Sequence, residues 1–226
     1  MIRILILPVL LLCCNMLQAQ KIENTFYAGL AMSNLKPVDK IDGEATKFTF
    51  HPGIAFGYSV TSPIGKVFQL QPGLNFVQKG GKSDERDSAY GVSYKDTIVL
   101  NYFELPLNFL YHSTKKLKGF FIGAGPVVSM GIGGKERGST YFDNGQSSSS
   151  LTAISFGGSK ENEFCLFEFS VNGITGYSFS NGLSVAFNYN KGFSNLVQGS
   201  AANVGKLTTS YFALRIGYSF YAVRKK

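Results

Sequence analysis

Tryptophan is absent from the 226 residues, cysteine occurs three times and histidine twice, and charged residues make up only 16% of the chain. Three cysteines in a chain of this length exclude a disulfide-stapled scaffold. The sequence has no run of 18 apolar residues, which excludes a helical membrane protein. Disorder is excluded too, because an apolar share of 44% with 20 Phe and 12 Tyr can bury a core.

The abundant residues suit strands and turns. Gly occurs 26 times, and Gly, Phe, Tyr, Ser and Thr are poor helix formers, so a helical bundle is disfavoured. The net charge of +8 and the pI near 9.3 suggest nucleic acid or an anionic surface as a partner until the charges are placed.

The first 19 residues have the pattern of a secretory signal peptide. A positive start ending at Arg3 precedes an apolar stretch, and Ala19 stands at the −1 position of a cleavage site. A membrane anchor is the weaker alternative, because the apolar stretch is short and contains Pro8. Lipoprotein processing at Cys13 or Cys14 is a further weaker alternative, because Leu12 precedes Cys13 where a small residue is expected. We expect residues 1–19 to be removed and residues 20–226 to form one domain.

Large apolar side chains alternate with small or polar ones throughout the mature chain, the period of a half-buried β-strand. From Phe48 to Val60, for example, every second residue is Phe, Pro, Ile, Tyr or Val, and the others are small or polar. This periodicity predicts eight strands, at about 24–35, 47–61, 66–78, 97–111, 119–130, 164–179, 183–193 and 207–222.

The predicted connections alternate between short and long, so all the long loops of an up-and-down meander lie at one end. Either a soluble barrel or an outer-membrane barrel could use such strands. The bulky apolar faces fit lipid, and the opposite faces, rich in Gly, Ala, Ser and Asn, fit the narrow interior of eight strands. The sequence therefore predicts an all-β fold: an eight-stranded antiparallel transmembrane β-barrel in the cell outer membrane, with short periplasmic turns and long extracellular loops.

Aromatic residues near the predicted strand ends would supply the girdles at the two membrane surfaces. The expected girdle residues are Tyr27, Phe68, Tyr102, Tyr111, Phe193, Tyr211 and Tyr221.

One predicted strand, Leu100–Leu107, reads LNYFELPL and resembles the L-x-Y-x-E-x-P-L strand of the PorT-like outer-membrane β-barrel family of Bacteroidetes. The Gly-rich stretch 123–126 and the stretch 187–196 are similar to later strands of that family, although Asn188 stands where the family often has Arg. The resemblance implies the barrel fold and, through the member that gives the family its name, an accessory role in secretion across the outer membrane.

Three charged residues fall at mid-strand on the polar faces: Glu104, Glu168 and Arg215. Charges in such an environment should pair. We expect a lumen charge network in which Glu104 and Arg215 meet across the barrel. The network would be structural, and a gate or ion path is the alternative.

An enzyme needs a base, and His51 and His112 are the two histidines. No nucleophile motif accompanies them, so we expect no catalytic residues. The acidic residues 39, 42 and 44 match no metal-binding loop and are interpreted as solvated. We therefore expect neither a metal nor a cofactor.

These inferences together predict a non-enzymatic outer-membrane barrel that presents its loops for binding or assists secretion or another envelope function. A small channel through the lumen is the alternative. On the short-turn side eight basic residues face Glu23 alone, whereas 12 basic and 11 acidic residues lie on the long-loop side. The expected partners are outer-membrane lipids and other envelope or secretion proteins, without nucleic acid, and the barrel is expected to be a monomer.

Overall fold

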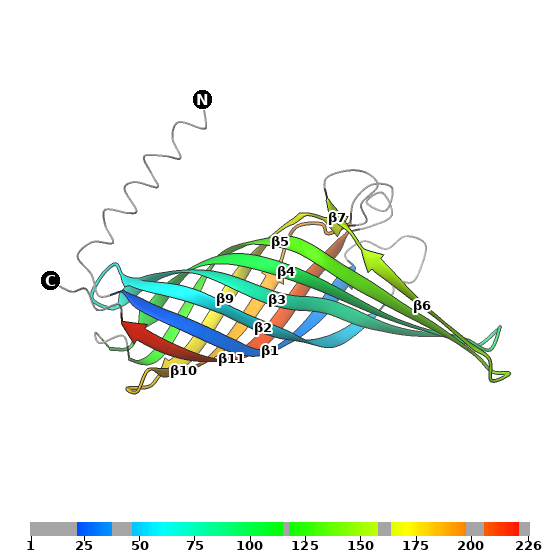
Figure 1. Cartoon of the computed structure of the whole chain (residues 1–226), viewed down its shortest axis with the longest axis horizontal. Coiled ribbons are helices and arrows are strands. Elements are labelled where there is room, and N and C mark those ends of the chain that lie inside the picture. The colour runs from blue at the N-terminus through cyan, green and yellow to red at the C-terminus, as the bar shows by residue number, and fades with distance from the viewer. Residues whose placement is uncertain (1–21, 38–46, 115–117, 158–163, 198–205, 222–226) are drawn as a thin grey trace, which may run out of the picture.

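Eight antiparallel strands form a closed ring in the computed structural model (Figure 1), which describes residues 22–37, 47–114, 118–157, 164–197 and 206–221. The strands are β1 (Glu23–Pro37), β2 (Phe48–Pro63), β3 (Phe68–Asp87), β4 (Val92–His112), β5 (Gly119–Phe142), β9 (Phe167–Ser178), β10 (Leu183–Gly192) and β11 (Leu207–Tyr221). Each pairs with its neighbour in the ring, and β1 closes it by pairing with β11. The predicted fold class is confirmed. The expected signal peptide lies outside the described residues.

The alternation in the sequence sets the two surfaces of the wall. On β1, Phe26 and Leu30 are exposed on the outer surface, whereas Ala31 faces the lumen and is buried. The same division holds on the other ring strands, so large apolar side chains cover the outside, as lipid contact requires. In the described part of the chain, no helix is long and apolar enough to cross a membrane.

The strands are tilted, and their register fixes the tilt. Following paired residues once around the ring from Tyr102 leads back to β4 at His112, ten residues further on. A shift of ten residues over eight strands corresponds to a tilt of about 40° to the barrel axis. The interior of such a barrel has room for side chains only.

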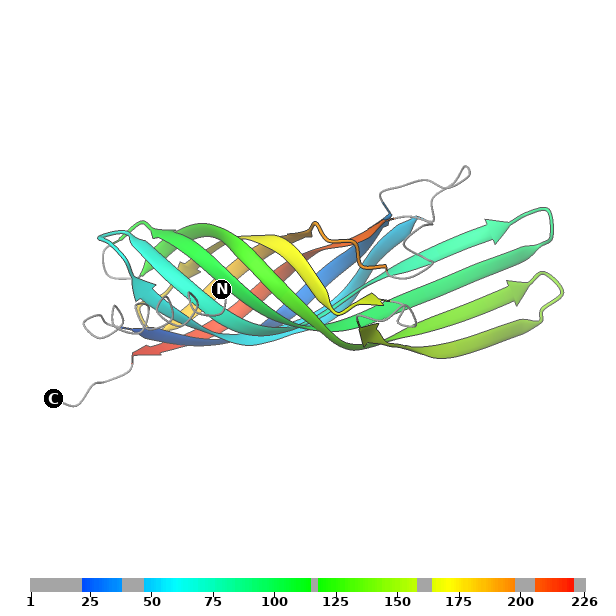
Figure 2. The same ribbon diagram turned by 90° about the horizontal axis from the view of Figure 1, so that it is seen from above.

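Three strands run well past the ring and form a structure that the sequence did not predict. The outer ends of β3, β4 and β5, together with β6 (Ser147–Ile154), make a four-stranded sheet that projects beyond the barrel (Figure 2). We call it the extracellular sheet, comprising residues 80–87, 92–99, 133–142 and 147–154. Except for residues 97–99, the sequence predicts these segments as loops, because they lack the regular apolar alternation of a half-buried strand.

The aromatic girdle was predicted only in part. Phe68, Tyr111 and Phe193 are exposed, as predicted. The prediction was wrong for Tyr102 and Tyr211, which point into the lumen and are fully buried. Tyr27 also faces the lumen, in contact with Arg215. The strand period explains these errors, because all three tyrosines fall on the small-residue side of their strands. The side chain of Tyr221 lies outside the described part.

Candidate functional site in the barrel lumen

A lysine between two glutamates forms the centre of the lumen. Lys79 Nζ of β3 lies 2.9 Å from Glu104 Oε1 of β4 and 2.8 Å from Glu168 Oε2 of β9. Tyr211 donates its hydroxyl hydrogen to Glu104 Oε2 at 2.7 Å, and Thr209 donates to Glu168 Oε1. All five side chains are buried. This ionic cluster therefore joins four strands of the ring, β3, β4, β9 and β11, across the lumen.

Lys79 is the member of the cluster that the sequence analysis missed. The predicted strand ended at residue 78, and Lys79 was counted with the long loops. Lys79 is in fact the next lumen-facing residue of β3 after Val77. Its ammonium also lies 4.6 Å from the centre of the Tyr102 ring and 5.4 Å from that of Tyr211, within the range of cation–π attraction.

Arg215 does not join the cluster. Among the described residues no carboxylate oxygen lies within 4.0 Å of it, so the expected ion pair with Glu104 is absent. The guanidinium instead lies 4.8 Å from the centre of the Tyr27 ring, and Nε has no hydrogen-bond partner in this part of the chain. Arg215 is thus set apart from the cluster of Lys79, Glu104 and Glu168.

A chain of side-chain amides crosses the lumen. Asn188 donates to Asn172 at 3.2 Å, and Asn172 donates to Asn108 at 2.9 Å. Asn108 then donates to Gln71 at 3.3 Å, and Gln71 to Thr61 at 3.1 Å. The chain links β10, β9, β4, β3 and β2. Asn172, Asn108 and Gln71 each donate and accept within the chain, whereas Oδ1 of Asn188 at its end has no hydrogen-bond partner in the described part.

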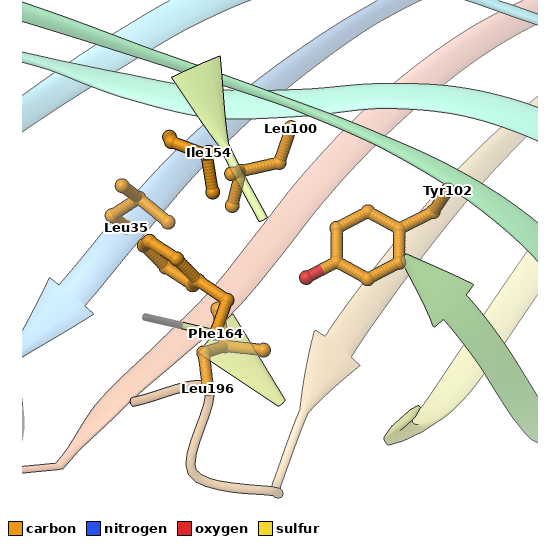
Figure 3. Packing of buried hydrophobic residues seen from close by; sticks show 6 residues of the cluster. All are labelled: Leu35, Leu100, Tyr102, Ile154, Phe164 and Leu196. Atoms are coloured by element: carbon orange, nitrogen blue, oxygen red, sulfur yellow. The ribbon is translucent and has the colours of Figure 1, made fainter. Parts of the chain in front are cut away.

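A cluster of buried apolar side chains, which we call the apolar plug, lies at the extracellular end of the lumen (Figure 3). It combines strand residues with residues of the loops that fold back over the opening, including β7 (Phe156–Gly157) and β8 (Phe164–Cys165). Its buried members are Leu35, Leu100, Tyr102, Ile154, Phe164 and Leu196. Tyr102 connects the plug to the ionic cluster. Its ring packs edge-to-face with that of Phe156, with 5.4 Å between the ring centres, and the ammonium of Lys79 lies over its face.

Packing fills most of the remaining lumen. Towards the short turns, Leu110, Phe121 and Ile174 form a second apolar layer, and His112 stacks on Phe121 at 5.3 Å. Between this layer and Arg215 lies a cavity of about 50 Å³. A space of that size holds a few water molecules and does not form a pore through the barrel.

The two histidines considered for catalysis do not converge on a site. His51 lies at the extracellular end of β2, far along the barrel from His112 at the opposite end of β4. In the described part neither Nδ1 atom has a hydrogen-bond partner, and no three His, Cys, Asp or Glu residues gather as metal ligands. The acidic residues 39, 42 and 44 lie outside that part. Cys165 is half-buried in β8, with Sγ 3.8 Å from the carbonyl oxygen of Val197.

A closed ring with an apolar exterior and a polar, packed interior defines an outer-membrane β-barrel. The model of the outer membrane protein β-barrel domain family matches residues 18–198, so the chain belongs to that family and resides in the cell outer membrane. None of the curated proteins matches the chain in sequence.

Several solved barrels are similar in fold. The chain is 11% identical to Ail of Yersinia pestis, with 88% of this chain and 98% of Ail covered and a TM-score of 0.41. For Neisserial surface protein A the identity is 12%, the coverage 87% and 97%, and the TM-score 0.43. For OprG of Pseudomonas aeruginosa the values are 14%, 90% and 98%, and 0.36.

Proposed function

We propose that this protein is a non-enzymatic surface barrel whose extracellular sheet contacts molecules outside the cell. The observation that carries the proposal is the sheet itself, which extends beyond the ring and exposes large side chains to water. These are Tyr90 at the hairpin end, 82% exposed, and Tyr94, Tyr141, Phe142 and Leu151. Exposed aromatic residues outside the membrane are typical of interaction surfaces.

The packed lumen favours this role over the alternative of a small channel. The apolar plug, the ionic cluster and the amide chain lie one after another along the barrel. We propose that the ionic cluster is structural, because its charges bind each other and the strands that carry them. A gate would need a path for ions on at least one side of Lys79, and packed side chains occupy both sides.

The closed lumen predicts that the protein conducts no ions across a bilayer. Purified protein inserted into planar bilayers should give no single-channel steps at 100 mV, because no hydrated path crosses the plug or the amide chain. A known porin inserted under the same conditions is the positive control. Steady unitary currents that disappear in Glu104→Gln would contradict the proposal and favour the channel.

We also propose that the chain is a PorT-like member of its family from a Bacteroidetes outer membrane, with an accessory role in secretion or another envelope function. The L-x-Y-x-E-x-P-L pattern supports this assignment, since its alternate residues Leu100, Tyr102, Glu104 and Pro106 form the lumen side of β4. A monomer that contacts outer-membrane lipids and envelope proteins is the proposed working state, because a closed ring leaves no strand edge in the membrane.

Photo-crosslinking tests the proposed contact surface. A photoreactive amino acid placed at Tyr90 or Tyr141 should capture protein or glycan when intact cells are irradiated, because both side chains project into water. The same residue at Phe109, which is exposed on the lipid-facing wall, is the control and should capture lipid alone. If neither position on the extracellular sheet gives an adduct above that control, the sheet is not a contact surface.

A further inference from the structure

The two faces of the extracellular sheet carry opposite charges. The outward face continues the lipid-facing wall, and its charged residues are Lys82, Asp84, Arg86, Lys95, Lys135 and Arg137. The inward face continues the lumen wall, and its charged residues are Glu85, Asp87, Asp96 and Glu136. The outward face of the sheet therefore has five cations and one acid, whereas the inward face has four acids. The near balance of charge on the long-loop side, seen in the sequence, conceals this separation.

Strand pairing establishes which residues share the outward face. Lys82 and Arg137 both pair with Thr97, so their side chains lie on one face of the sheet. Gly81, the neighbour of Lys82, lies on the other face, because a Cβ there would meet the side chain of Leu35 in the plug. Lys82 and Arg137 are exposed, and together with Lys135 we call them the cationic triad.

The triad lies just above the apolar outer wall. Lys135 is the third residue after Ile132, which is exposed and apolar, on the same strand. Three residues of a strand tilted by about 40° rise about 8 Å along the barrel axis. The headgroup layer of one membrane leaflet is about 5–8 Å thick. Lys135 is therefore at headgroup level, and the long side chains of the other two can reach down to it.

Among the described residues, the cations further from the membrane have acidic partners, whereas the basic groups of the triad have none. Lys95 Nζ lies 3.2 Å from Asp84 Oδ2, and Arg86 Nη2 lies 3.3 Å from Asp143 Oδ1. Within the described ranges, no carboxylate oxygen comes within 4.0 Å of the basic groups of the triad. Unneutralised positive charge is thus concentrated where the sheet leaves the membrane.

We propose that the cationic triad binds the phosphate groups of phosphorylated glycolipid headgroups in the outer leaflet. Lys82 and Arg137 are two strands apart, about 10 Å, and Lys135 is about 7 Å from Arg137 along β5. This spacing lets the triad hold one headgroup at more than one phosphate. A guanidinium binds phosphate through two parallel hydrogen bonds, and the ammonium groups add point charges. Leu151, which pairs with Arg137, adds an exposed apolar contact at the same level.

Lipid retention in nanodiscs tests the proposal with the full-length protein. The discs contain phosphatidylcholine with either diphosphoryl lipid A or its dephosphorylated form, and native mass spectrometry counts the lipid that stays bound. Lys135→Gln/Arg137→Gln should retain about 25-fold less diphosphoryl lipid A than the wild type, because each of the two cations near an anionic surface contributes about a fivefold preference. Arg86→Gln/Lys95→Gln is the matched control, which removes the same charges from the same face, and should change retention less than about twofold.

Three results would overturn the proposal. Equal loss in both double variants would mean that general charge, and not the triad, holds the lipid. Equal retention of the phosphorylated and dephosphorylated lipids would mean that phosphate is not recognised. A third arm adds the soluble, de-acylated headgroup to protein in pure phosphatidylcholine discs. If this soluble headgroup binds as tightly as the lipid, the ligand of the triad is a soluble polyanion, and the lipid is rejected as its ligand.

Discussion

Lys79→Met should destabilise the folded barrel by about 3–5 kcal/mol, the cost typical of breaking a buried ion pair by removing one partner. The substitution keeps the length of the side chain but leaves two buried carboxylates, those of Glu104 and Glu168, facing each other without the cation between them. Urea unfolding in phosphatidylcholine vesicles, followed by the heat-modifiable gel shift of folded barrels, measures the effect.

The comparison variants separate charge from packing. Lys66→Met changes an exposed lysine in the β2–β3 turn and should leave the unfolding midpoint unchanged. Adding Glu104→Gln and Glu168→Gln to Lys79→Met removes the unpaired charges and should recover most of the lost stability. If Lys79→Met is no less stable than Lys66→Met, the ion pairs of the lumen do not stabilise the fold.

Gly192→Ala should cost about 1–3 kcal/mol, as expected for overpacking a filled interior. A Cβ at Gly192 would collide with Glu168 Oε1 and would lie 3.0 Å from the backbone oxygen of Thr209. The carboxylate cannot easily move aside, because Lys79 and Thr209 hold both of its oxygens. The same unfolding experiment in vesicles reports the loss.

A second glycine provides the matched control. Gly173 lies on β9, and a Cβ there would meet nothing closer than 3.9 Å, so Gly173→Ala should be neutral or slightly stabilising. In a double-mutant cycle, Gly192→Ala should cost much less once Glu168→Ala is present, because the collision with the carboxylate is gone and only the contact with Thr209 remains. An undiminished cost in that background would place the strain in the backbone and not at the cluster.

The sequence predicts the ring well because lipid contact imposes a strong pattern. A lipid-facing wall needs a large apolar residue at every second position, and the eight predicted strands correspond to the eight of the ring. The same reasoning placed Glu104 and Glu168 in the lumen. It failed where the pattern weakens: β6 and the outer ends of three strands are largely exposed outside the membrane, so little in their alternation marks them as strands.

The error at the lumen charges has a different cause. Pairing Arg215 with Glu104 assumed that mid-strand residues on opposite walls share one height. The shift of ten residues around the ring breaks this assumption, and only the register reveals it. Lys79 could have been found by continuing the alternation one step past Val77, but Gly80 and Gly81 follow it and resemble the start of a loop.

The closing pair of strands also determines when the lumen is complete. All 15 residues of β1 pair with β11, so the ring joins the first and last strands of the chain, whose contacts are the most distant in sequence. Contacts of that kind are slow to form. Tyr211 and Thr209, which donate to the two glutamates, both come from β11. An unclosed barrel therefore lacks two donors for its buried carboxylates, and the last strand of the ring supplies them. The ionic cluster thus has all its hydrogen bonds only in the closed barrel, which disfavours a barrel left open within the bilayer.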